Sequence, residues 1–488
     1  MSRVHPCRPW LAALAILLGV AACATNPVTG DQDFVLMSRE REIALGEKTH
    51  KQIMQQYSAY EDEALQNYVS RLGQRLAAKS HRPELDYTFT VLDSDEVNAF
   101  ALPGGYIYIT RGIMAYFNSE AELAGVLGHE LGHVTARHAV QQQSAATASD
   151  LLGGILLGAA GAGEGAAQLF QTVQLAAMRG YGREQELQAD RLGAQYLART
   201  GYDSSEMLDV VRILADQEEY ARAQAKAEGR EPTSYHGLFA SHPDNDARLQ
   251  EVIAAARQHE ADDPRPDGHA AYLRRIDGMT FGPSADQGKV VDHRFLHLAL
   301  DAALTAPDGW TIANQRQQIL FIAPDKAARM QVVLEPAKAD RSPRELLRRQ
   351  LDGADLARAQ SFEAHGYPGY TGVAVQNTQQ GRRPVRFTVI RKGDHAWYFA
   401  ATSREPGAFD RFDGTFVDIA QSLQTLTAAQ RRAAQPLHID VQTTEAETNY
   451  AALADPLERV EDAAAQLRLL NGDWPDEAPS PGLIKTLE

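Results

Sequence analysis

Two histidines and a glutamate carry the strongest chemical signal in the sequence. His129 and His133 lie four residues apart with Glu130 beside the first, in the pattern H-E-x-x-H. Four helical residues turn the chain by about 40° beyond one full turn, so both imidazoles can bind one ion. Glu130 borders that face, where it can act as a general base beside the metal. The pattern predicts a zinc site. The alternative, two unrelated histidines on a helix surface, is expected by chance in only about three chains in a hundred of this composition.

A catalytic zinc ion needs a third protein ligand and an open fourth position for water. Glu186 is the candidate third ligand, in a second helical stretch that runs towards Gly201. Asp190 follows four residues later on the same face, where it could accept the ring N–H of a zinc-bound histidine. The acidic pair means little alone, because acidic helical faces are common, and gains specificity only from the H-E-x-x-H motif.

Three further residues are candidates for a fourth metal ligand or for stabilising an oxyanion: Tyr181, His242 and Arg248. His242 precedes Pro243, which favours an extended or turn conformation. It could cap the following helix, occupy the fourth position and inhibit the enzyme, or assist the reaction, and all three roles stay open. His138, nine residues beyond His129, should project from the opposite face of the helix, which predicts a packing or capping role.

The elements that position these residues follow from apolar spacing. Residues 118–142 begin with Ser119 and Glu122 in a capping pattern and continue with apolar residues at helical spacing, so the histidines lie inside a helix. Residues 105–110 alternate like a strand after a Pro-Gly-Gly turn. We expect its first residues to form an exposed edge to which an extended substrate adds, the alternative being a purely structural hairpin: Gly105, Tyr106, Ile107 and Tyr108.

Taken together, these motifs resemble the M48 (Ste24-like) zinc metallopeptidases in their bacterial lipoprotein form. The resemblance covers about residues 30–258 and rests on four segments: Gly128-His129-Glu130-Leu131-Gly132-His133, Glu186-Leu187-Gln188-Ala189-Asp190, Asn98-Ala99-Phe100-Ala101-Leu102-Pro103-Gly104-Gly105 and His242-Pro243. It implies a gluzincin-like domain with the active-site helix beneath a small sheet. It also implies one zinc ion held by His129, His133 and Glu186, with Glu130 as base. No 34-residue period follows, so the client recognition of members with tetratricopeptide repeats is not implied.

The N-terminus is typical of an exported lipoprotein. Arg3 and Arg8 precede a short uncharged stretch that ends Val20-Ala21-Ala22-Cys23, which resembles a lipobox. We expect residues 1–22 to be a signal peptide and Cys23 to carry lipid that anchors the protein to a membrane. Because Ala24 follows the cysteine, resemblance to Gram-negative lipoproteins favours the outer membrane, facing the periplasm. A Gram-positive surface and an ordinary signal peptide are the alternatives.

Composition narrows the class of protein further. The 488 residues are 44% hydrophobic and 23% charged, as in globular proteins, and should form two to three folded units. A net charge of -16 would repel a phosphate backbone, which argues against nucleic acid as a partner. Cys7 and Cys23 are the only cysteines, so disulfides and Cys-ligated metals are excluded from the body of the chain.

Domain organisation follows from composition and periodicity. A polar segment with two prolines at 259–268 should end a mainly helical peptidase domain at residues 23–262. Short β-type runs with two helical stretches predict an accessory domain with an antiparallel sheet at 263–430. The tail, 431–488, resembles a degenerate LysM-type peptidoglycan-binding module without a clear first strand. The expected fold class is α+β.

The leading interpretation is a zinc endopeptidase that cleaves unfolded or misassembled polypeptides in envelope quality control. The second interpretation is a largely silent peptidase that acts as a holdase, an assembly factor or a cell-wall-binding scaffold. Its partners would be peptidoglycan or the outer-membrane assembly machinery. Casein hydrolysis that a chelator abolishes and zinc restores would separate the two.

Overall fold

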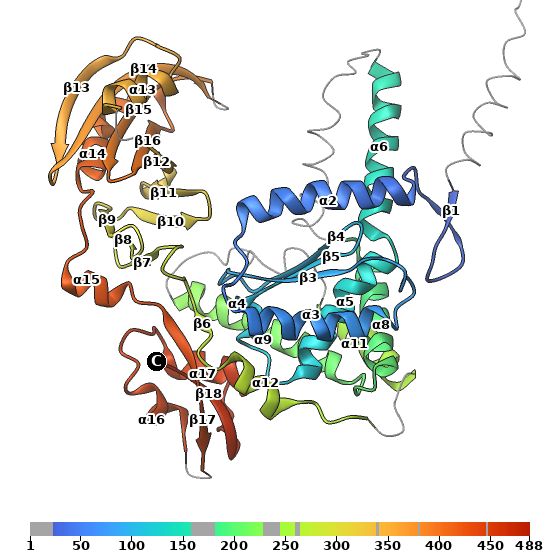
Figure 1. The fold of residues 1–488 in the computed structure, drawn as a ribbon. Helices are drawn as coiled ribbons and strands as arrows, with labels where there is room; N and C mark the ends of the chain where they lie inside the picture. Colours follow the sequence, from blue (N-terminus) through green and yellow to red (C-terminus); the bar gives the residue numbers. More distant parts are fainter. Residues whose placement is uncertain are drawn as a thin grey trace, which may run out of the picture. The chain divides into compact units, whose positions relative to one another are not determined.

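The computed structural model describes residues 23–157, 181–227, 245–258, 264–337, 341–378, 381–445 and 448–488. The chain divides into two compact units (Figure 1). Unit 1 consists of residues 1–281 and 437–488, and unit 2 of residues 282–436. Both contain helices and sheets with antiparallel strands, which confirms the α+β expectation.

A three-stranded sheet in the order β3-β5-β4 lies inside unit 1. The strands are β3 (Thr88–Leu92), β4 (Ala99–Leu102) and β5 (Tyr106–Thr110). β5 alternates aromatic and β-branched residues, a composition that favours strands. It pairs in parallel with β3 and antiparallel with β4.

The expected substrate-binding edge at residues 105–108 is wrong, because β5 is the central strand. Tyr106 pairs with Thr88 on one side and with Leu102 on the other. The outer side of β3 is also covered, since the Gln66 side chain hydrogen-bonds to both the N–H and the carbonyl of Val91. Within the described residues, β4 is therefore the edge strand that a further strand could join.

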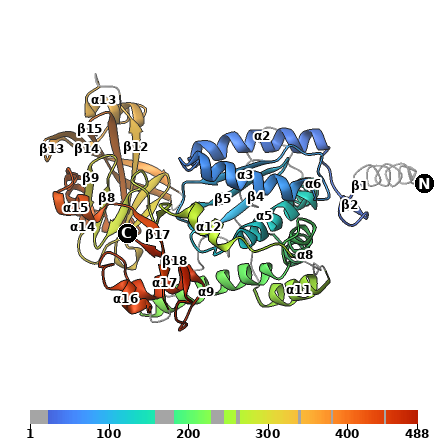
Figure 2. The ribbon, with the colours of Figure 1, turned by 60° about the horizontal axis from the view of Figure 1, so that its bottom comes forward.

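Helices cover both faces of this sheet, and Figures 1 and 2 show α2 and α5 on opposite sides of it. α2 (Arg39–Gln56) shares a small apolar core with β4 and β5, in which Leu45 and Ile53 join Phe100 and Tyr108. α3 (Glu63–Ala77) and α5 (Glu120–Thr135) pack on the other face. This arrangement agrees with the expected active-site helix beneath a small sheet.

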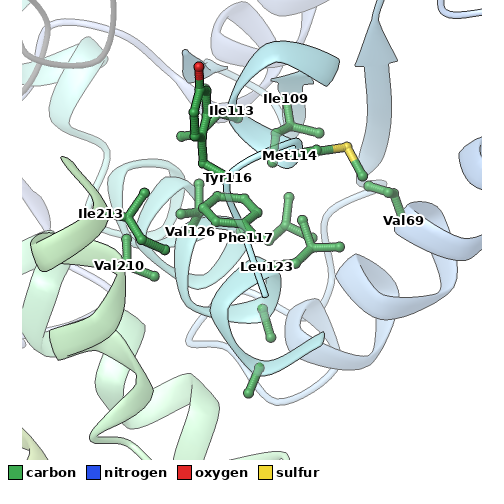
Figure 3. Packing of buried hydrophobic residues seen from close by; sticks show 14 of the residues in the cluster. Val69, Ile109, Ile113, Met114, Tyr116, Phe117, Leu123, Val126, Val210 and Ile213 are labelled. Atoms are coloured by element: carbon green, nitrogen blue, oxygen red, sulfur yellow. The ribbon is translucent and has the colours of Figure 1, made fainter. Parts of the chain in front are cut away.

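α5 is enclosed by the main core of unit 1. All its residues from 121 to 135 are buried. Figure 3 shows Phe117, just ahead of the helix, close to Leu123 and Val126 of α5, with Val210 of α9 (Glu206–Ala227) to their left. Burial of each such side chain stabilises the fold by roughly 1.5–3 kcal/mol. The helix that carries H-E-x-x-H is therefore held on every side.

The first part of unit 1 contains one more hairpin and five more helices among the described residues. A hairpin of β1 (Cys23–Thr25) and β2 (Gln32–Phe34) precedes α2. The remaining helices are α4 (Arg111–Met114), α6 (His138–Leu157), α8 (Arg183–Arg199), α11 (Asn245–Gln258) and α12 (His269–Ile276). No helix among the described residues is both long enough and apolar enough to cross a membrane.

Residues 437–488 return to unit 1, which differs from the boundaries expected at 262 and 430. They form β17 (Leu437–Thr444), α16 (Tyr450–Ala454), α17 (Ala463–Asn471) and β18 (Gly482–Leu487), and β17 also pairs with β6 (Thr280–Phe281). Ile439 and Leu487 share a core with α5. Buried Lys485 donates to the carbonyls of Ala115 and Phe117 at 2.8 and 2.7 Å. β17 supplies the strand that the sequence did not reveal, while the LysM resemblance stays a prediction.

Unit 2 is built on a seven-stranded antiparallel sheet, as the sequence predicted for this region. In order across the sheet, the strands are β10 (Thr311–Gln315), β11 (Gln318–Ile322), β12 (Ala328–Pro336), β16 (His395–Ser403), β15 (Gly381–Lys392), β14 (Tyr367–Thr378) and β13 (Ala357–Ala364).

Helices pack on both faces of this sheet. α14 (Phe409–Gln421) shares a core with Ile390, and α13 (Pro343–Gln350) shares another with Val389. Consecutive strand residues point to opposite faces, so the two helices lie on opposite sides. The smaller elements are β7 (Lys289–Val291), β8 (Arg294–His297), β9 (Ala302–Thr305) and α15 (Ala428–Ala433).

Candidate metal centre

α5 and α8 carry the candidate ligands and pack together at glycines. A Cβ on Gly128 of α5 would lie 3.3 Å from the Cα of Gly193 of α8, and a Cβ on Gly132 would lie 3.1 Å from the carbonyl oxygen of Ala189. The absence of side chains at these points lets the two backbones approach closely. The histidines of one helix can therefore meet the carboxylates of the other.

His129, His133 and Glu186 bring three potential ligand atoms together in a buried space. The Nε2 atoms of the two histidines are 3.0 Å apart. Glu186 places one carboxylate oxygen 3.6 Å from His129 Nε2 and the other 3.7 Å from His133 Nε2. Ligand atoms about 2.0–2.2 Å from a tetrahedral zinc ion are roughly 3.3–3.6 Å from one another. The three residues selected from the sequence therefore lie close to the separations that one metal ion requires, with the two Nε2 atoms slightly nearer to each other.

Asp190 fixes the tautomer of His129, that is, which ring nitrogen carries the hydrogen. Its Oδ1 lies 2.8 Å from His129 Nδ1, and both side chains are buried. An ionised carboxylate only accepts hydrogen bonds, so His129 Nδ1 donates and Nε2 presents a lone pair. This is the contact that the sequence predicted for Asp190.

His133 has a partner that the sequence analysis missed. Its Nδ1 lies 2.8 Å from Nδ1 of His138, whose Nε2 lies 2.9 Å from Oε1 of Gln188 on α8. Burial lowers the pKa of His138 to about 4, so its ring is neutral near pH 7. The expectation that His138 points away from the motif face is therefore wrong. It assumed one continuous helix, whereas α5 ends at Thr135 and α6 begins at His138.

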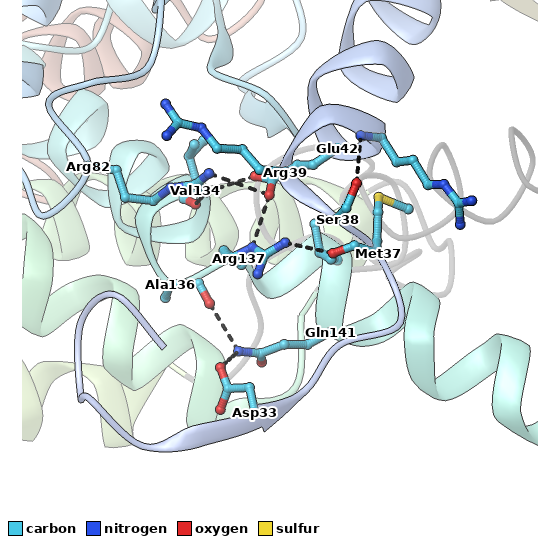
Figure 4. A network of polar contacts seen from close by, with 12 residues as sticks. Asp33, Met37, Ser38, Arg39, Glu42, Arg82, Val134, Ala136, Arg137 and Gln141 are labelled. Carbon is cyan, nitrogen blue, oxygen red and sulfur yellow. Dashed lines mark hydrogen bonds and ion pairs between the residues drawn. The ribbon is translucent and has the colours of Figure 1, made fainter. Parts of the chain in front are cut away.

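The break between these helices is a turn at Arg137, whose φ is 60°. A left-handed conformation costs a residue with a side chain roughly 1–2 kcal/mol. Figure 4 shows what offsets that cost: Arg137 Nε donates to Glu42 at 2.9 Å and Nη2 donates to the carbonyl of Met37 at 3.1 Å. Arg82 holds the same Glu42 carboxylate at 2.7 Å. Contacts from distant parts of the chain thus make the turn that brings His138 to His133.

Tyr181 is the next sequence candidate that the structure places at the site. Its ring stacks on His133, with centroids 3.9 Å apart and planes at 18°. Burial, with smaller effects from Glu130 and Glu186, raises the pKa of its hydroxyl, which is therefore protonated near pH 7. A role for Tyr181 towards an oxyanion stays a prediction. His242 and the side chain of Arg248 lie outside the described part of the chain.

A small cavity is lined by residues of both the candidate centre and the edge strand. It has a volume of about 10 Å³, and its lining includes Ala101 and Leu102 of β4 together with His133 and Tyr181. Such a volume holds about one water molecule. The carboxyl end of β4 therefore lies beside the candidate ligands, and Glu130 is fully buried in the same region of α5.

Comparison with known proteins agrees with this geometry. Residues 63–256 match the family model described as Peptidase family M48. These residues are an M48 peptidase domain. The candidate ligands, Glu130 and Asp190 all fall inside the matched range, and the M48 assignment implies a metal. The donor set fits one, since two imidazole nitrogens and a carboxylate oxygen, all ligand types of zinc, lie within 4.8 Å of one another.

Named relatives of the M48 domain are proteases. The beta-barrel assembly-enhancing protease of Yersinia pestis is 32% identical over 243 residues, which are 48% of this chain and 47% of that protein. Its counterpart in Escherichia coli (strain K12) is 31% identical over 242 residues, 48% and 47% of the two chains. The mitochondrial metalloendopeptidase OMA1 of Schizosaccharomyces pombe is 26% identical over 182 residues, 36% of this chain and 53% of that protein. The chain thus spans about half the length of these relatives.

Proposed function

We propose that this chain is a zinc-dependent endopeptidase that cleaves unfolded or misassembled polypeptides in the cell envelope. His129, His133 and Glu186 hold the ion, and Glu130 is the general base. The observation that carries the proposal is the convergence of three buried donor groups, 3.0 to 3.7 Å apart, on adjoining helices of an M48 domain. Two imidazoles and one carboxylate leave a fourth position of a tetrahedral ion for water.

The chemistry divides between the ion and the side chains. Zinc, when bound, lowers the pKa of a water molecule and polarises the substrate carbonyl. Glu130 accepts the proton of the attacking water and passes it to the leaving amine, so that the peptide bond is replaced by a carboxyl group and a free amine. Asp190 keeps the lone pair of His129 directed at the centre through the 2.8 Å contact with Nδ1.

β4 is the element to which an extended substrate adds in this proposal. It forms the outer strand of the sheet, and its carboxyl end borders the cavity beside His133. Strand addition relies on main-chain hydrogen bonds and demands little of the substrate side chains. A preference for unfolded polypeptides over a strict cleavage sequence follows from this geometry.

The cellular setting is inferred from the N-terminal motif and the names of the relatives. Cys23 would carry the lipid that anchors the protein to the outer membrane, facing the periplasm. The name beta-barrel assembly-enhancing protease supports a client or partner in outer-membrane assembly. Residues 437–488 would be the site for peptidoglycan if the LysM resemblance is functional. A mostly silent peptidase with a holdase role is the competing function.

Glu130→Gln tests the assignment of the base. The amide keeps the shape of the carboxylate but cannot accept the proton, so casein hydrolysis should fall about 10²- to 10⁴-fold while zinc content and folding stay unchanged. Glu184→Gln, the same change at an exposed residue of α8, is the matched control and should keep full activity. Activity of Glu130→Gln within tenfold of wild type would contradict the proposal. Wild-type protein that binds zinc but cleaves nothing would favour the holdase.

A further inference from the structure

We propose that His138 and Gln188 position His133 for metal binding, as Asp190 positions His129. The inference rests on the proposed function, because positioning matters only if His133 binds an ion. His138 belongs to the first turn of α6 and Gln188 to α8, so the two residues reach His133 from different helices. Neither residue lies among the three candidate ligands.

The direction of the hydrogen bonds follows from donor chemistry. Gln188 Oε1 can only accept, so His138 Nε2 carries the hydrogen in their 2.9 Å contact. Nδ1 of His138 is then the ring nitrogen that remains to accept. His133 Nδ1, 2.8 Å away, donates to it when His133 binds the ion through Nε2. Nε2 of His133 is left with a lone pair on the side of His129 and Glu186.

The opposite order of donors would disable the ligand. If His138 Nδ1 donated to His133, the single proton of His133 would move to Nε2. That proton would lie between His133 and His129, whose Nε2 atoms are 3.0 Å apart. Zinc binds the lone pair of a neutral imidazole, so this tautomer would have to rearrange before it could bind. The Gln188 oxygen therefore favours the tautomer in which His133 presents a lone pair to the metal ion.

The surroundings hold these residues in place. Gln185 of α8 exchanges hydrogen bonds of 3.1 Å with Gln141 and Gln142 of α6, which ties together the helices that carry Gln188 and His138. His138 is fully buried. Tyr181 stacks on the ring of His133 and limits its rotation. The ties between the two helices, the burial of His138 and the stacking of Tyr181 thus all help to keep His133 and His138 in contact.

Zinc affinity of the full-length chain tests the proposal, measured by competition with a chromogenic chelator. His138→Phe removes the acceptor for His133 Nδ1 and should weaken zinc binding about 10- to 100-fold, the usual effect of losing a hydrogen-bond partner of a ligand. His138→Asn places an amide oxygen close to the original Nδ1 and should recover most of the affinity. His138→Phe protein that is folded and binds zinc as tightly as wild type would overturn the proposal, even if its Tm had fallen.

A second pair of variants keeps the test decisive if His138→Phe fails to fold. Gln188→Leu removes the acceptor and should weaken zinc binding, whereas Gln188→Glu retains an acceptor and should bind close to wild type. Gln185→Leu cuts contacts between the same helices without touching His138, so it should change Tm more than zinc affinity. Equal affinities for Gln188→Leu and Gln188→Glu would overturn the positioning role. Wild-type protein that binds no zinc would instead overturn the proposed function itself.

Discussion

Glu186 and Asp190 lie one turn apart on α8, yet their surroundings give them different tasks. Glu186 faces the Nε2 atoms of both histidines at 3.6 and 3.7 Å, whereas Asp190 lies 2.8 Å from Nδ1 of His129. A carboxylate on the Nε2 side can bind the ion, and one on the Nδ1 side can only orient the ring. The assignment of the third ligand therefore depends on which ring nitrogen each residue meets.

Glu186→Ala should lose tightly bound zinc, because two protein ligands remain where a catalytic site has three. Metal analysis after dialysis would give much less than one zinc ion per chain, with Glu184→Ala as the control on the same helix. Stoichiometric zinc in Glu186→Ala would show that the third ligand lies elsewhere.

A pH-dependent stability is expected from Glu206, which lies at the start of α9 and accepts a hydrogen bond from Ser119, the N-cap of α5, at 3.4 Å. Burial, followed by the charges of Asp209, Asp267 and Asp203, raises its pKa from 4.5 to about 7. An acid with a raised pKa in the folded state favours folding while protonated, so this stability is lost as pH rises through about 7. Glu206→Gln should have a higher Tm than wild type at about pH 8 and the same Tm near pH 4. An equal difference at both pH values would contradict the assignment.

At the level of single residues, the sequence predicted the candidate metal ligands better than the residues that hydrogen-bond to those ligands. Regular helical spacing places His129 and His133 on one face, and that geometry needs no knowledge of the fold. His138 was missed because its position depends on the left-handed turn at Arg137, and arginine gives no sign of such a turn. Glu42, which holds that turn, lies 95 residues away in the chain.

Among the elements, the contact between α5 and α8 sets the distances of the candidate centre. It depends on Gly128, Gly132 and Gly193, where backbone meets backbone. Side chains at these positions would push the helices apart and separate the ligands they carry. The glycines at this contact therefore set the distances between the candidate ligands as well as allowing the two helices to pack closely.

Gly193→Val should lower both zinc affinity and Tm, because a Cβ at this position would lie only 3.2 Å from the backbone nitrogen of His129. Overpacking of this kind typically costs about 1–3 kcal/mol. Gly182→Ala, where an added Cβ meets nothing within 4 Å, is the control and should leave both unchanged. Chelator competition and thermal unfolding would measure the two effects. Wild-type zinc affinity in folded Gly193→Val would show that the helix contact does not set the ligand distances.

Periodicity predicted most elements correctly but not their neighbours in space. Alternation in residues 105–110 correctly indicated a strand, yet only the fold shows that β5 is central and β4 lies at the edge. The first helical stretch of the accessory domain, α13, ends at Gln350, and the strand β13 begins soon after it at Ala357. Pattern alone reports which residues are buried, whereas strand order depends on long-range pairing.

For the molecule as a whole, unit 1 is assembled from two stretches separated by unit 2. The chain leaves unit 1 at Phe281 and returns at Leu437, and these two residues are paired in antiparallel strands. Paired Cα atoms of such strands lie about 4.5–5.5 Å apart. The exit and the return are therefore neighbours, as expected for an inserted domain.

Replacing residues 282–436 by a short glycine linker should leave a folded unit 1 that still binds zinc, because the linker has only to join two paired residues. Ending the chain at residue 436 should instead destabilise unit 1 severely, since Ile439, Leu470 and Leu487 belong to its core. Circular dichroism, thermal unfolding and zinc binding would compare the two proteins. A stable, zinc-binding protein that ends at residue 436 would contradict the shared core.

The buried contacts of Lys485 also bear on when the candidate metal centre can be completed during synthesis. The carbonyls of Ala115 and Phe117 lie just ahead of the helix that carries the histidines, and they receive their donor from a residue 370 and 368 positions later. Buried carbonyls without a donor are costly, so the packing around this helix stays incomplete while later residues are still being synthesised. We expect a nascent chain to have the H-E-x-x-H segment before the contacts that complete its surroundings can form. If the chain is the proposed peptidase, the order of synthesis would delay its activity until the last residues have been made.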